Sequence, residues 1–197
     1  MKITILILFI LIYCEAIFCQ QTSINQFNIE RQKINKTGLK VLAAYNIANI
    51  VYGSIASSQA GSGKNKYFHE MNAIWNGINL GIVGLGFLFT RKEGIDSYVI
   101  SSTKQSNTEK LFLFNAGLDL AYITGGAYLT ERSKTSPNNS ERLKGYGESI
   151  ILQGAVLFLF DGIMYTTHHK HGKGLSKIAE KMHFSFSGYG PGVVVKL

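Results

Sequence analysis

Four segments of about twenty residues that are almost free of charge place the strongest constraint on the fold of this chain. Residues 41–63 and 71–90 contain no charged side chain, and residues 111–130 and 149–167 contain one each, Asp119 and Asp161. A helix needs roughly 20 apolar residues to cross a bilayer, so each segment has the length of a membrane span. The pattern predicts an all-α protein, an integral membrane bundle of four transmembrane helices.

Turn-forming residues separate the four segments. Gly61 and Gly63 follow the first, Gly94 follows the second, and residues 136–140 (Ser-Pro-Asn-Asn-Ser) separate the third from the fourth. Short connections place consecutive helices antiparallel, so residues 20–169 are expected to form two antiparallel hairpins. None of the segments is purely apolar, and a soluble all-α bundle with unusually apolar helices is therefore the competing fold.

Residues 1–19 have the composition of a secretory signal sequence. Lys2 precedes an apolar run at residues 3–13, which is too short to span a bilayer. Cleavage after Ala16 or after Cys19 leaves at most one of the two cysteines, Cys14 and Cys19, in the mature protein. A disulfide within the mature chain is therefore not expected.

Polar residues recur at helical spacing in the four segments. Intervals of three, four and seven residues place them on one face of each helix, and in a membrane such faces turn toward the bundle interior. Gly77 and Gly81 form a pair of small residues that permits close approach of a neighbouring helix. The candidate binding residues of this polar layer are Asn46, Asn49, Asn76, Asn79, Asn115, Asp119 and Asp161.

The depths of these residues follow from the turns, because residues equidistant from a turn lie level in an antiparallel hairpin. The first turn is expected to be centred between Ser62 and Gly63, and the second near Ser140. The resulting level pairs are Asn46 with Asn79, Asn49 with Asn76, and Asp119 with Asp161.

Two roles are open for this layer. Hydrogen bonds between membrane helices contribute about 0.6 kcal/mol each, which favours a structural or interaction protein with a hydrogen-bonded core. An acid in the bilayer costs about 2.5 kcal/mol or more, and two acids at one depth repel unless a proton or a cation lies between them. The alternative function is therefore a small transporter, channel or small-molecule binder that uses Asp119 and Asp161.

Three histidines, His168, His169 and His171, cluster where the fourth segment ends. Neighbouring histidines bind Zn²⁺ in many proteins, but no cysteine or acid at ligand spacing completes a motif here. They are weak metal candidates, and neither a metal site nor a cofactor is expected. No nucleophile, base and orienting group occur at an interpretable spacing, so no catalytic residue is assigned and an enzyme is not expected.

The tail at residues 170–197 is basic at its start, and residues 183–187 alternate like a β-strand. A cleaved signal sequence starts the mature chain outside the inner membrane, and four spans return its end to the same side. The expected location is the cell membrane, multi-pass, with both termini on the outer (periplasmic) side. The distribution of Lys and Arg opposes this orientation, since the loops expected inside carry fewer of them than the outer loop and tails.

Partners follow from charge and surface. The formal net charge is +8, but the basic residues are scattered through loops and tails rather than gathered in one patch. Nucleic acid is therefore not expected as a partner. The expected partners are the lipid bilayer and either a second copy of the chain, as a homo-oligomer, or another membrane protein.

Two runs of sequence resemble an uncharacterised family of small bacterial four-helix membrane proteins. They are residues 67–79, Tyr-Phe-His-Glu-Met-Asn-Ala-Ile-Trp-Asn-Gly-Ile-Asn, and residues 46–53, Asn-Ile-Ala-Asn-Ile-Val-Tyr-Gly. The resemblance covers the four predicted spans and not the tails. It implies the same fold and no particular activity, because none is assigned to that family.

Overall fold

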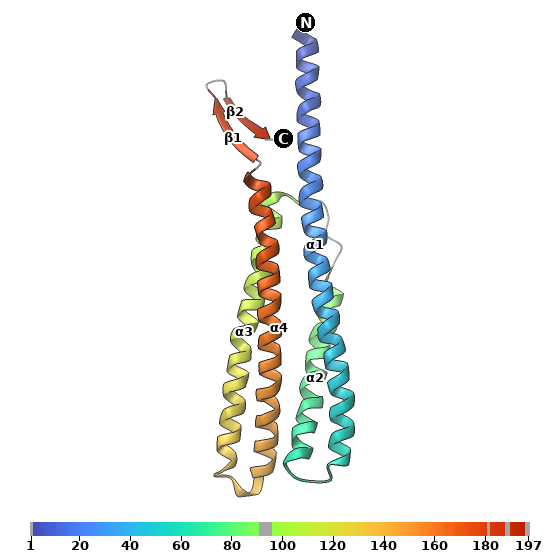
Figure 1. The fold of residues 1–197 in the computed structure, drawn as a ribbon, viewed down its shortest axis with the longest axis vertical. Helices are drawn as coiled ribbons and strands as arrows, with labels where there is room; N and C mark the ends of the chain where they lie inside the picture. Colours follow the sequence, from blue (N-terminus) through green and yellow to red (C-terminus); the bar gives the residue numbers. More distant parts are fainter. Residues whose placement is uncertain (1, 91–95, 181, 188–189, 196–197) are drawn as a thin grey trace. The chain divides into compact units, whose positions relative to one another are not determined.

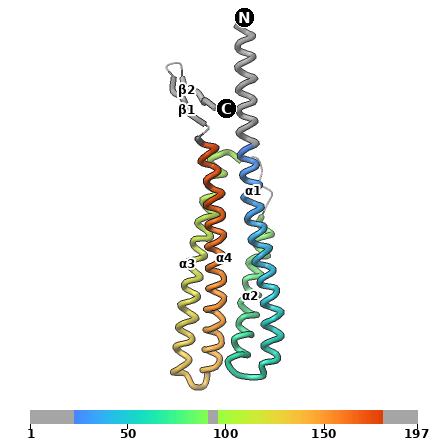
Figure 2. Tube along the Cα trace, in the orientation of Figure 1, coloured from blue at the N-terminus to red at the C-terminus, as the bar shows by residue number. Residues whose placement is uncertain are grey.

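Four long helices make up most of the chain. The computed structural model describes the backbone of residues 2–90, 96–180, 182–187 and 190–195, and the side chains of residues 23–90 and 96–179. The helices are α1 (Lys2–Gln59), α2 (Lys64–Phe89), α3 (Tyr98–Ser133) and α4 (Ser140–Glu180), with a short 3-10 helix, η1 (Pro137–Asn139), before α4 (Figures 1 and 2). The prediction of a fold built on four helices is confirmed.

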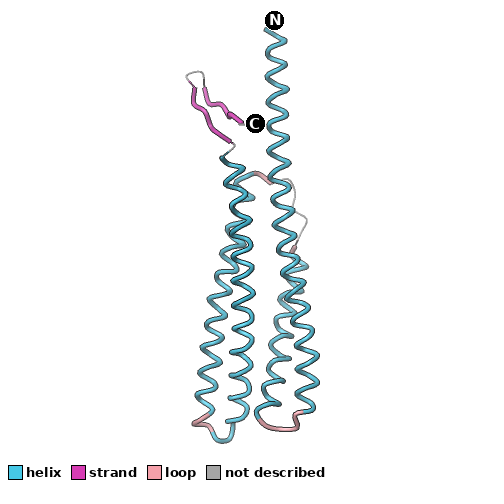
Figure 3. Tube along the Cα trace, in the orientation of Figure 1, coloured by secondary structure: helices cyan, strands magenta, loops and turns pink. Residues whose placement is uncertain are grey.

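A two-stranded hairpin follows the last helix. Strands β1 (Met182–Ser187) and β2 (Gly190–Val195) pair antiparallel, with Phe184 opposite Val193 (Figure 3). The hairpin lies within the predicted C-terminal tail, but α4 continues to Glu180, so the basic residues 170–179 at the start of that tail are helical.

The two short connections use residues suited to them. Gly61 and Gly63 have φ angles of 65° and 91°, a region that residues with a Cβ seldom adopt. Pro137 opens η1, where its missing amide hydrogen is not needed and its fixed φ suits a helix start. Each connection therefore has a local cause in the sequence.

The chain forms two units. Unit 1 comprises Met1–Ile34, Lys92–Glu109 and Thr167–Leu197, and unit 2 comprises Asn35–Arg91 and Lys110–Thr166. Parts of α1, α3 and α4 belong to each unit, whereas α2 belongs to unit 2 alone. Neither α1 at residue 19 nor α4 at residue 169 has a break, and the domain boundaries expected at those positions stay predictions.

Helices of unit 2 pack closely at glycines. A Cβ added to Gly126 would lie 2.7 Å from the Gly147 oxygen, and one on Gly53 would lie 2.8 Å from the His69 oxygen. Only glycine permits such close approach of two backbones. The pair expected to do this, Gly77 and Gly81, was the wrong choice, because a Cβ at either position meets no atom within 4 Å.

The register of the first hairpin follows its turn. Leu39 contacts Gly86, and Asn72 lies against Gly53, which centres the turn between Ser62 and Gly63 as predicted. The second hairpin differs, because α3 already ends at Ser133 and the contact of Gly126 with Gly147 centres the turn between residues 136 and 137. Asp119 and Asp161 are therefore offset along the helix axes rather than level.

Unit 2 has a polar interior and an apolar surface. Asn46, Asn76 and Gln153 are 0% exposed, whereas Leu159 and Ile163 are each 65% exposed. This distribution reverses that of a water-soluble bundle, in which the apolar stripe of each helix faces the core.

Three of the four helices are long and apolar enough to cross a membrane, judged by length and composition over the described residues: the segments Ser23–Gln59, Lys64–Phe89 and Pro137–Ala179. Helix α3, which holds the third predicted span, is not among them. Asn115, Asp119 and several glycines and hydroxyl residues lower its mean hydropathy. Counting charges alone, without the other polar groups, therefore overestimated how apolar the third predicted span is.

Candidate functional site

A network of amide side chains joins three helices inside unit 2, with Asn72 of α2 at its centre. The Asn72 Nδ2 donates to the Asn49 Oδ1 at 3.2 Å, and the Asn72 Oδ1 accepts hydrogen bonds from the Asn76 Nδ2 and the Gln153 Nε2. The Tyr45 hydroxyl donates to the Gln153 Oε1 at 3.0 Å. Helices α1, α2 and α4 are therefore linked by side-chain hydrogen bonds inside the bundle.

The candidate binding residues did not include the centre of this network. Asn72 and Gln153 lie on the polar faces of their helices, at the spacing that marks the candidate residues, so the sequence carried a signal for both. Tyr45 lies four residues before Asn49 and shares its helix face, but a tyrosine in an apolar run is equally typical of a packing residue and so was not singled out. Asn49 and Asn76, which were expected to lie level with each other, are both bonded to Asn72.

A cavity of about 180 Å³ lies among all four helices of unit 2. Four predicted residues, Asn79, Asn115, Asp119 and Asp161, line it together with Tyr122. Its remaining walls are one aliphatic side chain from each helix: Leu42 of α1, Ile82 of α2, Leu118 of α3 and Leu157 of α4. Six of the seven predicted residues thus divide between the hydrogen-bonded network and the cavity, and Asn46 belongs to neither.

The two acids share this cavity and are buried. Asp119 is 3% exposed and Asp161 is 6% exposed, and their carboxyl groups are close enough to interact with each other. Two carboxylates in contact repel when both are ionised, so the pair requires one shared proton or a nearby cation.

Several buried polar atoms of unit 2 have no hydrogen-bond partner among the described residues. Both side-chain atoms of Asn46 are in this state, and so are the Asn79 Nδ2 and the Asp119 Oδ2. Leaving a buried donor or acceptor without a partner costs about 1–3 kcal/mol. The interior of unit 2 is therefore suited to water or to a polar ligand, most of all at the cavity.

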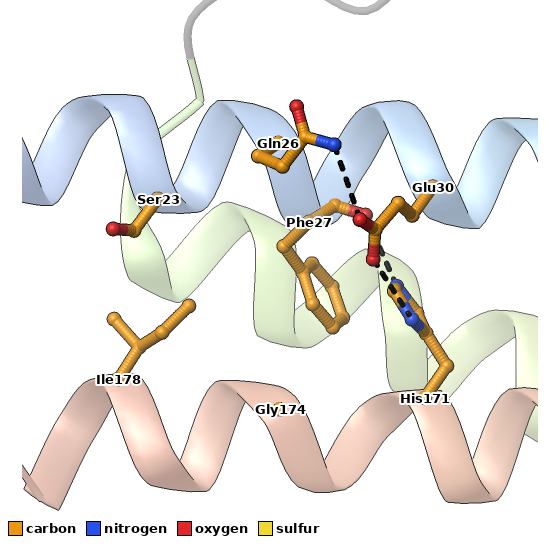
Figure 4. A pocket seen from close by; sticks show the side chains of 7 residues that line it. All are labelled: Ser23, Gln26, Phe27, Glu30, His171, Gly174 and Ile178. Carbon is orange, nitrogen blue, oxygen red and sulfur yellow. Dashed lines mark hydrogen bonds and ion pairs between the residues drawn. The ribbon is translucent and has the colours of Figure 1, made fainter.

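Unit 1 has a larger hollow, of about 470 Å³, between α1 and α4 (Figure 4). Its polar side chains already have partners. Glu30 accepts a hydrogen bond from Gln26 at 3.1 Å and faces His171 at 3.9 Å. His171 contacts the Phe27 carbonyl oxygen at 3.0 Å and stacks on the Phe27 ring at 4.1 Å. This hollow therefore presents no comparable set of open polar groups.

The three histidines suggested as weak metal candidates occupy different surroundings in unit 1. His168 is fully buried, His169 lies 3.2 Å from Glu109, and His171 stacks on Phe27. Within the part of the chain that the structure describes, no three His, Cys, Asp or Glu side chains are close enough to hold a metal ion.

By its fold and its cavity, the protein is a helical bundle in which amide and acid side chains of unit 2 face the interior and aliphatic side chains face outward. The chain belongs to the family of unknown function DUF6992, which matches residues 41–162. All seven candidate residues and the cavity fall inside this range. No curated protein and no solved structure matches the chain.

The resemblance to an uncharacterised family is thereby confirmed. The family match gives neither an organism nor a location, so the bacterial origin and the membrane location stay predictions.

Proposed function

We propose that the protein is an integral membrane protein whose unit 2 is embedded in the bilayer. The observation that carries the proposal is the reversed distribution of side chains in unit 2. The exposed fraction is 77% for Leu88 and Phe89 and 65% for Leu159, while asparagine, glutamine and aspartate fill the interior. In water this arrangement loses the stabilisation of apolar burial, whereas in lipid it satisfies the polar groups and leaves the apolar ones in hydrocarbon.

The charged residues support the same placement. Lys40 and Lys64 bound the first apolar segment, Glu70 and Arg91 bound the second, and between these pairs the chain carries no charge. Helix α4 has 41 residues and is therefore about 60 Å long, twice the thickness of the hydrocarbon core. The embedded part is thus a portion of each long helix, and we assign it to unit 2.

Helix α3 is the fourth span in this proposal, although its composition alone is less apolar. Its outward side chains are apolar, with Leu113, Phe114 and Leu120 between 51% and 64% exposed. Its polar residue Asp119 is 3% exposed and lines the cavity instead. The low mean hydropathy of α3 therefore comes in part from its inner face.

The role of the polar layer in this proposal is structural. Asn72 holds α1, α2 and α4 together by interhelical hydrogen bonds, and the bundle presents its apolar surface to lipid or to another membrane protein. The proposal also includes a signal sequence at residues 1–19 and the placement of both termini on the periplasmic side of the membrane.

The labelling of introduced cysteines tests the membrane proposal. In a chain with Cys14 and Cys19 replaced by alanine, Leu159→Cys and Ser62→Cys are each exposed to a membrane-impermeant maleimide in whole membranes and after solubilisation in denaturant. We expect Leu159→Cys to react only after denaturation, because lipid covers a side chain that is 65% exposed in the protein. Ser62→Cys, in the turn, reacts in permeabilised membranes. Equal labelling of both sites in permeabilised membranes, before denaturation, would contradict the proposal.

A second function, binding or transport of a small solute by Asp119 and Asp161, is favoured by one observation. The two acids line a cavity to which all four helices contribute, and the Asp119 Oδ2 has no hydrogen-bond partner there. A purely structural layer has no need of two buried acids, because neutral amides supply the same hydrogen bonds at lower cost in a bilayer. Solute uptake into proteoliposomes that is lost in Asp161→Asn would support this function, and uptake unchanged in that variant would contradict it.

A further inference from the structure

The cavity of unit 2 has two chemically different parts. Leu42, Ile82 and Leu157, together with Leu118, make an aliphatic wall with one side chain from each helix. Asp119 and Asp161 make an acidic wall. A ligand that fits both parts has an apolar body and a positive charge.

The volume of the cavity gives the size of the ligand body that it can enclose. Its volume is about 180 Å³. An engineered apolar protein cavity of about 150 Å³ binds benzene, so a body of six to eight non-hydrogen atoms is the matching size. A single hydrated metal ion would leave the aliphatic wall in contact with water.

The acidic wall is open to a donor. The Asp119 side chain is 97% buried, and its Oδ2 accepts no hydrogen bond from any described residue. An ammonium group supplies N–H donors and positive charge together, and hydrogen bonds between charged groups are the strongest of their kind. One proton shared by Asp119 and Asp161 leaves the pair with a single negative charge, which matches one ammonium.

An inorganic cation fits the walls less well. Calcium takes six to eight oxygen ligands, and zinc takes nitrogen, sulfur or oxygen ligands in a tetrahedral set. Over the described residues, no three His, Cys, Asp or Glu side chains converge. Tyr122 instead adds an aromatic ring to the lining, and aromatic rings attract cations of low hydration.

We propose that this cavity binds a small organic cation, an ammonium carried on an apolar body, with Asp119 and Asp161 holding the charge and the aliphatic wall holding the body. The proposal rests on the second function given above, solute binding by the two acids, and names its ligand class. It does not depend on the membrane side to which the cavity opens.

The single tryptophan of the chain reports on this cavity. Trp75 packs edge-on against Tyr122 with ring centroids 4.8 Å apart, and Tyr122 lines the cavity. The experiment titrates the full-length protein, purified in detergent, with benzylammonium and separately with benzyl alcohol, a neutral molecule of the same shape. Trp75 fluorescence is the readout. We expect a saturable change with benzylammonium and affinity weaker by about tenfold or more for benzyl alcohol, since only the cation satisfies the buried acid.

Variants locate the site. Asp119→Asn and Asp161→Asn are each expected to weaken benzylammonium binding by about tenfold or more, because each removes a buried charge partner. Glu131→Gln removes an exposed acid of the same helix α3, which is paired with Lys134, and is expected to leave binding unchanged. If the cavity variants fail to fold, the comparison of the two wild-type titrations still shows whether the protein selects the cation over the neutral molecule.

Several results would overturn the proposal. Equal affinity for benzylammonium and benzyl alcohol would show an apolar cavity without charge selection. A response to sodium or calcium chloride but not to benzylammonium would show an inorganic cation site. No response to benzylammonium in the folded protein, or an unchanged affinity in both folded Asp variants, would exclude the site. Cysteine labelling reports on the membrane proposal separately, so failure of one does not imitate failure of the other.

Discussion

Units 1 and 2 are built largely from the same three long helices, yet their surfaces differ. Among the described residues, unit 1 holds only Ile29, Val99 and Ile100 of the large apolar side chains that are exposed, and all the others belong to unit 2. Unit 1 carries ion pairs on its surface, such as Lys104 with Asp96 at 2.6 Å. This difference is what the proposed membrane placement requires, with water around unit 1 and lipid around unit 2.

The interiors differ less than the surfaces. Among the described residues, each unit buries three apolar side chains together with amide side chains, but the buried charged group is Arg31 in unit 1, whereas unit 2 buries the acids Asp119 and Asp161. The buried apolar residues are Ile24, Phe27 and Leu175 in unit 1 and Val83, Leu157 and Met164 in unit 2. In water the apolar core supplies the stability, but in lipid it supplies none, so packing at glycines and interhelical hydrogen bonds must replace it. Each of the following substitutions changes a residue in one of the two units and tests how that unit is stabilised.

The largest effect is expected from a charge on the outer surface. Leu159→Lys places an ammonium near the middle of the fourth apolar segment and should cost about 2.5–3.5 kcal/mol of insertion free energy. Val99→Lys, on the equally exposed surface of unit 1, should change stability by about 0.5 kcal/mol or less. The fraction of each variant that resists alkaline extraction from membranes measures the difference. Equal extraction of the two variants would remove the distinction between the units.

The next effect concerns the interior of unit 1. Arg31 is 1% exposed and donates to the Ser101 carbonyl oxygen at 3.1 Å, and Asn28 donates to the Ser101 hydroxyl at 2.9 Å. Arg31→Ala leaves the buried Ser101 carbonyl oxygen without this donor, although Asn28 still donates to the Ser101 hydroxyl, and should cost about 2–3 kcal/mol. Hydrogen exchange should accelerate in residues 98–109 and stay slow in residues 110–133. Lys33→Ala, at an exposed position two residues along, is the matched control.

Uniform acceleration of hydrogen exchange along the whole of α3 in Arg31→Ala would contradict this prediction. It would mean that the two units unfold as one cooperative body, since local opening confined to one unit requires separate stabilities.

A smaller effect separates two adjacent glycines of unit 2. A Cβ at Gly126 would lie 2.7 Å from the Gly147 oxygen, while a Cβ at Gly125 meets nothing within 4 Å. Gly126→Ala should therefore lower stability by about 1–2 kcal/mol through forced separation of α3 and α4. Gly125→Ala should not lower it. Thermal unfolding in detergent measures both, and similar melting temperatures would argue against close packing of the two helices.

The sequence predicted the helices and the reversed surface better than the contacts. Charge-free length and helical spacing located the helices and placed Asn46, Asn76, Asp119 and Asp161 inside, because these patterns depend only on local periodicity. The partners of Asn49 and Asn76 were not predictable, since they depend on how the helices cross at Gly53.

Two further features of the site could not be predicted from the sequence, for the same reason. The choice of Gly53 and Gly126 over Gly77 and Gly81 as packing points depends on which face of each helix meets a neighbour. The cavity arises where one aliphatic side chain from each helix fails to fill the space beside two acids. Neither feature can be predicted from the spacing of residues along one helix.

The smallest expected effect concerns Asn72, whose side chain bonds to Asn49, Asn76 and Gln153. Asn72→Leu removes all three bonds, and at about 0.6 kcal/mol each the loss should be about 1–2 kcal/mol. Asn65→Leu, at an exposed position in the first turn of α2, is the control. A double variant with Gln153→Leu should cost less than the sum of the two single variants, because they share one bond. Thermal unfolding in detergent provides all four values. Should Asn72→Leu stabilise the protein instead, the amide layer would be maintained at the expense of stability, and the binding function would gain over the structural one.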